Sequence, residues 1–347
     1  MKHPLVFVLY DSITNSIFDS QIAEPLIRQQ TDPQITITVI SFEKKTESKR
    51  LKTITHQYPT ITFIFLKNRI FLHKTLLNPL VQKLHQILKQ LPSYKLIARG
   101  PIAGYLCTQA VEKTACLEFI IQARAILAEE YRFTHAHSNT IFTKAVHYFR
   151  AYFYEQLERS VYRKQFSYSV PTTIESVSPT LKEYLITNYY ADANMIMIAQ
   201  SDIPAPFSLE VITKWRKNTR KELNLSENRF VYCYNGSLKP WQCPEETLSF
   251  FKQELSKNRN AFLLILTHNK EEFEALIKKR LDEPTTYKVL AVPHKEIYRY
   301  LAACDAGVIL REKNSINWTS RPTKILEYQA VNLPIIHNNT IAILENS

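Results

Sequence analysis

The sequence predicts an α/β protein built from two doubly wound parallel sheets. Short runs rich in Val, Ile, Leu, Phe and Tyr alternate along the whole chain with segments whose apolar residues recur every three or four positions. Continuous apolar strands that alternate with such helices are typical of parallel sheets buried on both faces. The chain has 347 residues, of which 45% are apolar and 22% charged, so it can bury the cores of two ordinary domains.

The predicted strands fall into two series. They lie at 4–10, 35–41, 61–66, 94–98, 117–121, 173–178 and 194–199, and then at 229–236, 261–267, 287–292, 306–311 and 333–336. Between most of them lies a segment of helical period, as in "PEETLSFFKQELSKN" (244–258). The stretch "SDIPAPFS" (201–208) carries two prolines and separates the series. We therefore expect a Rossmann-like N-terminal domain at 1–200 and a second at 201–347.

Composition restricts the classes of partner and compartment. Lys and Arg number 44 against 32 Asp and Glu, a formal charge of +12, which favours nucleic acid, an acidic membrane surface or phosphate-bearing ligands; solvated basic faces are the plainer alternative. With four glycines, the chain has no Gly-rich phosphate loop. Its five scattered cysteines, without a CxxC pair, predict reduced, mostly buried thiols in a cytoplasmic protein. No apolar run approaches the ~20 residues that span a bilayer.

The segment 142–166, "FTKAVHYFRAYFYEQLERSVYRKQF", is helical in period, aromatic and basic. Phe142, Val146, Phe149 and further residues at the same spacing form an apolar stripe. Such a helix can rest on an anionic membrane surface. It can also pack on its own sheet, with Tyr and Arg stems covering apolar surface, and this second interpretation is preferred.

Polar residues follow several of the predicted strands, where ligands bind in open parallel sheets. They are Asp11, Ser12 and Asn15 after the first strand, Arg99 after the fourth, Gly236, Ser237 and Lys239 after the first strand of the second series, and Arg311 after a late one.

The stretch "SRPTKILEYQAVNLPII" (320–336) predicts a helix followed by a strand. Ser320 or Thr319 can cap this helix, and Pro322 suits its first turn. A helix N-terminus attracts anions, and Arg321 and Lys324 would add positive charge there.

Glu327 lies one to two turns further along the same helix. A carboxylate at this place can accept hydrogen bonds from a vicinal diol such as a ribose, so the stretch suggests a nucleotide site. The alternative is a surface helix with a Lys324–Glu327 pair worth about 0.2–0.5 kcal/mol.

Four stretches resemble a known family. "SRPTKILEYQAVNLPII", "YNGSLKPWQ" (234–242), "VSPTLKEYL" (177–185) and "KEIYRYLAACDAGVIL" (295–310) are similar to motifs of the GT-B glycosyltransferases, in particular the retaining family 4 (glycosyl transferases group 1). The resemblance is strongest from about 170 to 337. It implies two Rossmann-like domains that face each other across a cleft, with 1–200 on the acceptor side and 201–347 binding the donor.

The same resemblance implies a hexosyltransferase-type enzyme of polysaccharide biosynthesis. It would transfer a sugar from a nucleotide-diphosphate sugar, UDP-linked, to a glycan or lipid-linked acceptor, without metal or other cofactor, in the cytoplasm or peripherally on the inner membrane face. The implied catalytic residues are Arg99, Lys239 and Glu327. The implied donor-binding residues are Gly236, Ser237, Lys239, Val292, Pro293, Arg321, Lys324 and Glu327, and Asp11, Ser12 and Asn15 are implied on the acceptor side.

Two alternatives remain open. Thr319 stands where the family pattern usually has an acidic residue, and the chain ends about ten residues after "LPII". These features favour a truncated or catalytically impaired relative that binds nucleotide sugar or glycan. The charge of +12 favours nucleic-acid binding, but the aromatic and glycine modules of common RNA binders are missing, so no nucleic-acid partner is predicted.

Overall fold

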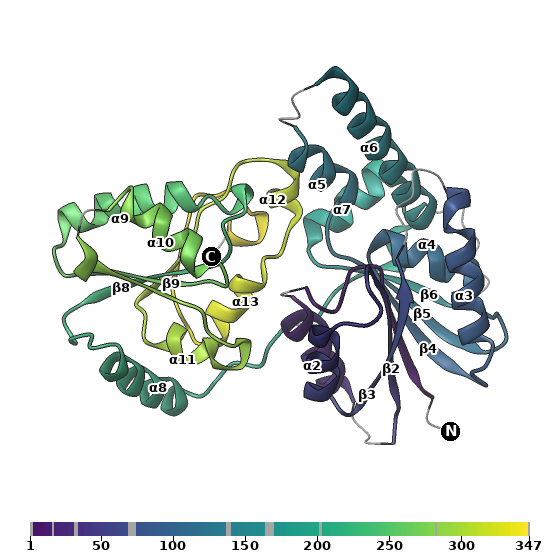
Figure 1. Cartoon of the computed structure of the whole chain (residues 1–347), viewed down its shortest axis with the longest axis horizontal. Coiled ribbons are helices and arrows are strands. Elements are labelled where there is room, and N and C mark those ends of the chain that lie inside the picture. The colour runs from purple at the N-terminus through teal and green to yellow at the C-terminus, as the bar shows by residue number, and fades with distance from the viewer. Residues whose placement is uncertain are drawn as a thin grey trace. The chain divides into compact units, whose positions relative to one another are not determined.

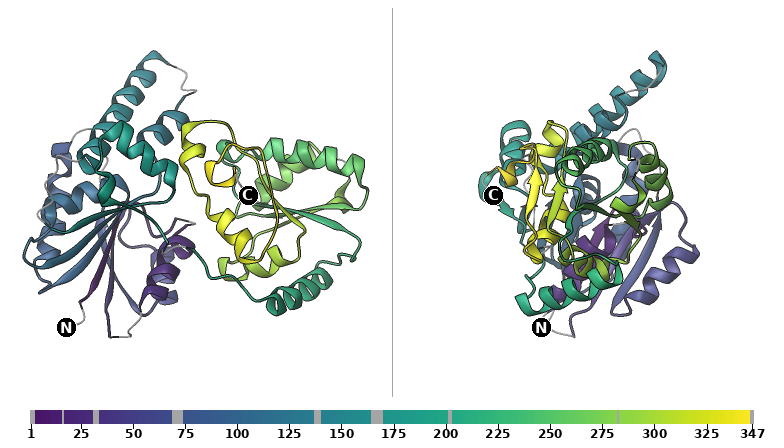
Figure 2. Two further views of the ribbon diagram at one scale, coloured as in Figure 1. Left: turned by 180° about the vertical axis from the view of Figure 1, so that it is seen from behind. Right: turned by 90° about the vertical axis from the view of Figure 1, so that its left-hand side faces the viewer.

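The computed structural model of the protein describes residues 3–15, 17–30, 34–68, 74–136, 140–163, 170–200, 203–281 and 283–345. The chain divides into Met1–Asp202 (unit 1) and Ile203–Ser347 (unit 2). Each unit contains one sheet flanked by helices (Figures 1 and 2). The predicted fold class, α/β with two parallel, doubly wound sheets, is confirmed.

Unit 1 contains a seven-stranded parallel sheet in the order β3-β2-β1-β4-β5-β6-β7. Its strands are β1 (Leu5–Leu9), β2 (Ile37–Glu43), β3 (Ile61–Lys67), β4 (Tyr94–Arg99), β5 (Cys116–Ala123), β6 (Thr172–Ser176) and β7 (Ile196–Ile198). The order reverses between β1 and β4, so the loops after these two strands diverge to opposite faces of the sheet. In parallel sheets such a switch point is where ligands bind.

The helices of unit 1 cover both faces of this sheet. They are α1 (Glu24–Gln29), α2 (Lys49–Gln57), α3 (Asn78–Leu88), α4 (Gly100–Ala110), α5 (Leu127–Thr134), α6 (Ile141–Tyr162) and α7 (Pro179–Tyr189). Ser48 and Ser178 cap α2 and α7 by accepting hydrogen bonds from the backbone N–H of Leu51 and Leu181. These caps satisfy N–H groups that have no partner inside the helix.

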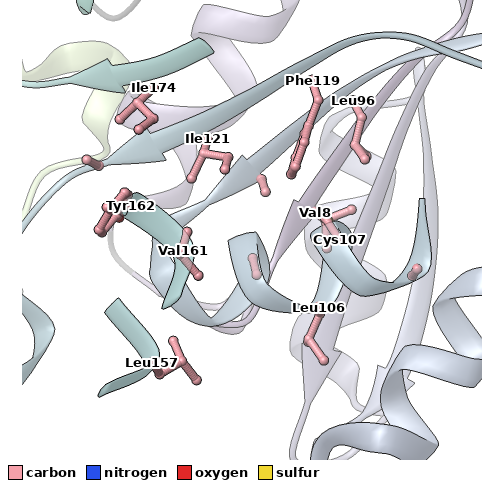
Figure 3. Close-up of a cluster of buried hydrophobic side chains, with 14 of the residues drawn as sticks. Val8, Leu96, Leu106, Cys107, Phe119, Ile121, Leu157, Val161, Tyr162 and Ile174 are labelled. Carbon is pink, nitrogen blue, oxygen red and sulfur yellow. The ribbon is translucent and has the colours of Figure 1, made fainter. Parts of the chain in front are cut away.

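Alternation along β1 shows why both faces are buried. Val6 and Val8 belong to a core shared with α3, α4, α6 and α7, whereas Phe7 and Leu9 belong to a core shared with α1 and α2. Successive strand side chains point to opposite faces, so an uninterrupted apolar run requires cover on each side. Figure 3 shows part of the first core, where side chains of α4 and α6 lie against those of the strands.

The two halves of helix α6 differ in how deeply their side chains are buried. Phe153, Leu157 and Val161 in its C-terminal half are buried in the core, as the packing interpretation of 142–166 predicts. The N-terminal half contradicts it, because Phe142 and Phe149 of the predicted stripe are 77% and 68% exposed. The N-terminal half of the helix projects beyond the sheet of this unit (Figure 1). Residues 164–166 of the predicted segment lie outside the described residues.

A buried carboxylate joins α6 to α5. Glu158 accepts hydrogen bonds from the backbone N–H groups of Leu127 (2.7 Å) and Ala128 (3.1 Å), at the N-terminus of α5, and from the hydroxyl of Tyr189 (2.9 Å). Burial raises the pKa of Glu158 to about 8, while these three donors favour the charged form. The carboxylate thus replaces the side-chain cap that Ile126 does not supply to α5.

Unit 2 contains a five-stranded parallel sheet in the order β10-β9-β8-β11-β12. Its strands are β8 (Phe230–Asn235), β9 (Ala261–Leu266), β10 (Tyr287–Leu290), β11 (Ala306–Ile309) and β12 (Ile335–His337). This order repeats that of the first five strands of the sheet in unit 1. The switch point of unit 2 therefore lies between β8 and β11.

Helices also cover both faces of the second sheet. They are α8 (Leu209–Glu222), α9 (Pro244–Lys257), α10 (Lys270–Lys278), α11 (Ile297–Ala302), α12 (Ser315–Thr319) and α13 (Thr323–Ala330). Helices α9 and α10 supply one core, and α11 and α13 supply the other. The five cysteines are all buried, as predicted. In the described parts of the chain, none of the helices has the length and apolar character needed to cross a bilayer.

Candidate functional site

The loops that follow β8 and β11 meet at the switch point of unit 2. The loop after β8 contains Gly236, Ser237 and Lys239, and the loop after β11 begins close to Arg311. Helix α13, which belongs to the stretch 320–336, reaches the same place. Because β8 and β11 are neighbours in the sheet, side chains from these three segments gather at one edge.

Glu327 of α13 is the carboxylate at this edge. It is only 6% exposed. The side-chain amide of Asn235, the last residue of β8, donates to Oε2 of Glu327 at 2.6 Å. Nε2 of His294, in the loop after β10, lies 3.3 Å from Oε1 of the same carboxylate. Segments from three parts of the chain thus hold Glu327 in a defined orientation.

The neighbouring residue, Tyr328, explains why Glu327 sits there. The Tyr328 ring is fully buried, and a Cβ on Gly307 of β11 would come within 2.5 Å of a carbon of this ring. The hydroxyl of Tyr328 accepts a hydrogen bond from the backbone N–H of Asn235 at 3.3 Å. Glycine at 307 is therefore required for close approach, and Tyr328 anchors α13 across β8 and β11.

Lys324, one turn before Glu327, is buried at this edge. Its Nζ donates to Oε1 of Gln242 at 3.2 Å and lies 5.0 Å from the centre of the Tyr234 ring. A Cβ on Gly236 would lie 2.6 Å from this Nζ and closer still to Oε1 of Gln242, so a larger residue at 236 would displace these two side chains. Burial lowers the pKa of Lys324 well below its usual value, the positive charge of Arg311 lowers it further, and Glu327 opposes the shift.

Arg311 is a second buried cation, 6% exposed, in the loop after β11. Its Nη1 donates to the backbone carbonyl of Trp241 at 3.0 Å. Within the part of the chain that the structure describes, neither Nε of Arg311 nor Oγ of the nearby Ser237 has a hydrogen-bond partner. Two buried cations and one carboxylate leave this region with an excess of positive charge and with unused donors, which an anion would satisfy.

The structure corrects the predicted start of the last long helix. Helix α13 begins at Thr323 with Pro322 at its cap position, so neither Thr319 nor Ser320 caps it. Instead, the hydroxyls of Thr319 and Ser320 donate back to the carbonyls of Ser315 and Asn317 in α12. The residue before a proline favours extended backbone, and this ends α12 and delays α13. Arg321 consequently precedes the helix.

The other predicted donor residues lie around the same edge. Lys239 is exposed in the loop after β8, with its Nζ 4.9 Å from the Trp241 ring centre. Val292 and Pro293 follow β10 and lead directly to His294, which contacts Glu327. The structure thus brings Gly236, Ser237 and Lys324 together with Glu327, while Lys239 occupies the exposed side of the loop.

Unit 1 places its predicted site residues at its own switch point. Asp11, Ser12 and Asn15 form the turn after β1, where Oγ of Ser12 accepts from the backbone N–H of Thr14 at 3.0 Å. Arg99 ends β4 and is 8% exposed, with its guanidinium donating to the side chain of Gln21. Both segments lie at the carboxyl ends of the adjacent strands β1 and β4.

Sequence reasoning missed two contributors to the site, Asn235 and His294, which hold Glu327. It placed Arg311 after a late strand but did not assign it the second buried charge of the site. The position of Arg311 and Asn235 at the ends of β11 and β8 was a usable signal, because those strands flank the switch point. His294 had no comparable signal, since its approach to Glu327 depends on how the β10 loop folds. No group of three or more metal-ligating side chains occurs among the described residues.

Most of unit 2 matches a known protein family. Residues 216–345 match the family described as "Glycosyl transferases group 1". A search of curated proteins by sequence found no match to the chain.

Similar solved structures include WaaG, a glycosyltransferase involved in lipopolysaccharide biosynthesis, with a TM-score of 0.61 at 14% identity over 98% of this chain and 82% of that one. A glycosyltransferase from Rickettsia africae ESF-5 has a TM-score of 0.60 at 14% identity, covering 99% and 82% of the two chains. The lipopolysaccharide outer core galactosyltransferase WaaB has a TM-score of 0.56 at 14% identity, covering 98% and 81%. These likenesses extend over both units. Residues 216–345 therefore belong to glycosyl transferases group 1, in a chain that has the GT-B fold.

Proposed function

We propose that this protein transfers a hexose-type sugar from a nucleotide-diphosphate sugar, UDP-linked, to a hydroxyl of a glycan or lipid-linked acceptor. The observation that carries the proposal is the pairing of a buried carboxylate, Glu327, with two buried cations, Arg311 and Lys324, at the switch point of unit 2. A ribose offers two hydroxyl donors to the carboxylate, and a diphosphate offers negative charge to the cations.

Each donor-binding residue then has a role. Glu327 accepts hydrogen bonds from the ribose, and the backbone at Val292 and Pro293 lies beside the base. The diphosphate lies against the loop of Gly236 and Ser237, with Lys239 and Arg321 reaching it from outside. Unit 2 is the donor domain in this proposal, and unit 1 contributes the acceptor side through Asp11, Ser12, Asn15 and Arg99.

In the proposed reaction, the bond between C1 of the sugar and the diphosphate oxygen breaks, and its electron pair stays on that oxygen. The oxygen of the acceptor hydroxyl forms the new bond to C1, and its proton passes to the diphosphate or to solvent. Negative charge grows on the leaving diphosphate, where fixed cations stabilise the transition state more than the ground state. Lys239, Arg311 and Lys324 would supply this charge without a metal, and retention of configuration is the proposed stereochemistry.

A donor screen tests the proposal directly. Calorimetry of the purified chain with UDP, GDP and ADP should detect binding of UDP in preference to the others. UDP-sugar hydrolysis should then be measured by release of UDP, since many transferases turn over slowly to water. Binding without any turnover favours the alternative of an impaired nucleotide-sugar-binding relative. Failure to bind any of the three nucleotides contradicts both.

Lys324 should couple UDP binding to proton uptake. Its pKa is lowered well below the usual value by burial, and a nearby diphosphate raises it again. Below the pKa of the free protein Lys324 is already protonated, so affinity is full there. Affinity should fall as pH rises from that pKa to the higher pKa of the complex, because a proton must then be taken up.

Calorimetry in two buffers of different ionisation enthalpy measures this uptake. The titrations should cover a series of pH values above neutral, where the terminal phosphate of UDP, with a second pKa near 6, is ionised, so that the change in proton uptake comes from the protein. Lys324→Met should abolish the buffer dependence and weaken UDP about 10-fold or more. The matched control is Lys257→Met, which removes an exposed lysine of the same unit and should change neither quantity. A binding enthalpy that is equal in both buffers for the unmodified protein contradicts the role of Lys324.

A further inference from the structure

The loop after β11 contains buried hydrogen-bond donors without acceptors. Residues 310–322, here called the α12 segment, connect β11 to α13 and contain the short helix α12 (yellow in Figure 1). Nε of Arg311 and Nδ2 of Asn314 are both buried in this segment, and neither has a hydrogen-bond partner among the described residues. These two atoms can donate but cannot accept. A ligand that fits the segment must therefore supply acceptors.

The orientation of Asn314 is fixed by the start of α12. Its Oδ1 accepts a hydrogen bond from the backbone N–H of Asn317 at 2.9 Å, as a helix cap does. This bond assigns the two ends of the amide, because only the oxygen can accept. Nδ2 of Asn314 is thus the end that the cap does not use, and it offers two N–H groups.

Unit 2 has no matching surplus of buried acceptors. In the described residues of this unit, no buried carbonyl or carboxylate oxygen of a side chain is left without a donor. The charge of the α12 segment agrees with this, since Arg311, Lys313 and Arg321 are positive and Glu312, its one acidic residue, is exposed. A ligand group that matches the segment accepts hydrogen bonds and carries negative charge.

The diphosphate of the proposed donor accounts for part of this surplus. In the proposed function the ribose lies at Glu327, and the diphosphate lies against the loop after β8, where Gly236 passes close to Nζ of Lys324. Asn314 follows another strand, three residues beyond Arg311 in the sequence. The sugar is the part of the donor that extends past the diphosphate, away from the ribose, so it is the part that the remaining donor can bind.

We propose that the sugar of the donor is a hexuronate, a hexose whose C6 is a carboxylate, and that Asn314 donates to this carboxylate through Nδ2. The inference rests on the proposed function and names the chemical class of the transferred sugar. A neutral hexose has a hydroxyl at C6, which brings a proton that itself requires an acceptor, whereas a carboxylate has two oxygens that only accept. Hydrogen bonds to a charged acceptor are also roughly twice as strong as those between neutral groups.

Calorimetry with pairs of donors that differ only at C6 tests the proposal. UDP-glucuronate should bind at least about 10-fold more tightly than UDP-glucose, because charge-assisted hydrogen bonds separate the two. UDP-galacturonate and UDP-galactose form a second pair, so that the configuration at C4 does not decide the result. The titrations belong at about pH 7.5, where a carboxyl group with an ordinary pKa of about 4 is ionised.

Asn314→Asp should remove the preference for the uronate. Aspartate keeps the oxygen that caps α12, so the variant should keep the thermal unfolding midpoint of the unmodified protein. It replaces Nδ2 by a charged acceptor, which repels a carboxylate but accepts from a hydroxyl. The ratio of uronate to hexose affinity should therefore fall at least about 10-fold. This ratio cancels any effect of the new charge on the diphosphate, which both donors share.

The matched control is Asn258→Asp. Oδ1 of Asn258 also accepts from a backbone N–H, that of Asn260 at 2.9 Å. Asn258 is exposed directly after α9 and before β9, at the opposite end of the sheet from the site, so the variant adds the same charge elsewhere. The control should keep the unmodified preference for uronates.

The outcomes separate this proposal from the proposed function. Equal or tighter binding of the neutral hexose in both pairs, together with binding of UDP, overturns the hexuronate and leaves the UDP site in place. An unchanged preference in Asn314→Asp overturns the role of Asn314. Failure to bind UDP contradicts the donor site itself, and the hexuronate with it.

Discussion

Glu327→Gln should weaken UDP binding about 100-fold while leaving the protein folded. Two hydrogen bonds from ribose hydroxyls to a charged acceptor contribute about 1.5 kcal/mol each, and their sum of about 3 kcal/mol corresponds to roughly 150-fold in Kd. Glutamine keeps the shape of the side chain and one acceptor oxygen, so Asn235 can still donate to it. Glutamine loses the charge and one acceptor, which are the features that the diol requires.

The measurement is a calorimetric titration with UDP and with 2′-deoxy-UDP. For the unmodified protein, the deoxy nucleotide should bind more weakly, and in Glu327→Gln the difference between the two nucleotides should shrink, because the lost hydroxyl and the lost carboxylate belong to one interaction. Glu254→Gln is the control, since this carboxylate accepts from Tyr232 and Lys257 elsewhere in unit 2. Unchanged UDP affinity in Glu327→Gln would place the donor ribose elsewhere.

Arg220→Met should destabilise unit 2 by about 3–5 kcal/mol. Arg220 is 1% exposed, on α8, and donates to the backbone carbonyls of Ala303 (3.0 Å), Ser226 (2.9 Å) and Arg229 (2.6 Å). It also donates to Asp305 at 3.3 Å. Methionine fills a similar volume, but it leaves three backbone carbonyls and one carboxylate oxygen without the donor that Arg220 supplies. Each buried acceptor without a donor lowers the free energy of unfolding.

Urea unfolding followed by tryptophan fluorescence measures this loss. All three tryptophans, Trp215, Trp241 and Trp318, lie in unit 2, so the signal reports on that unit alone. Arg216→Met is the matched control, because Arg216 donates to the same Asp305 and to the carbonyl of Cys304, but its side chain is 33% exposed. We expect a loss of about 1 kcal/mol there. Equal losses for both variants would show that burial does not increase the contribution of Arg220 to the free energy of unfolding.

The sequence was sufficient to predict the strands of both sheets. In the described residues, β1 to β12 fall on the predicted segments, because a strand buried on both faces must be apolar throughout its length. Their parallel direction follows from the alternation with helices, since a crossover of that length returns the chain to the same end of the sheet. The order within each sheet was not deducible from this pattern, because it depends on which strands pair.

Helix ends and burial were harder to predict. Ser320 and Thr319 have the chemistry of a helix cap, but their hydroxyls bond to α12, which precedes them. The stripe that contains Phe142 and Phe149 has the spacing of a core helix, and spacing alone does not tell whether a sheet lies beneath it. In both cases the local sequence allows two outcomes, and contacts with other segments select one.

The sequence by itself determined the α/β class, the two series of strands and the stretches from which site residues come, because periodicity and residue type are local properties. Only the tertiary structure decided that Asn235 and His294 hold Glu327, that Arg311 and Lys324 are buried cations at one switch point, and that the first half of α6 is left uncovered. The reason is physical. The free energy of a charged or hydrophobic side chain in the folded protein depends on its surroundings, and these surroundings come from segments far apart in the chain.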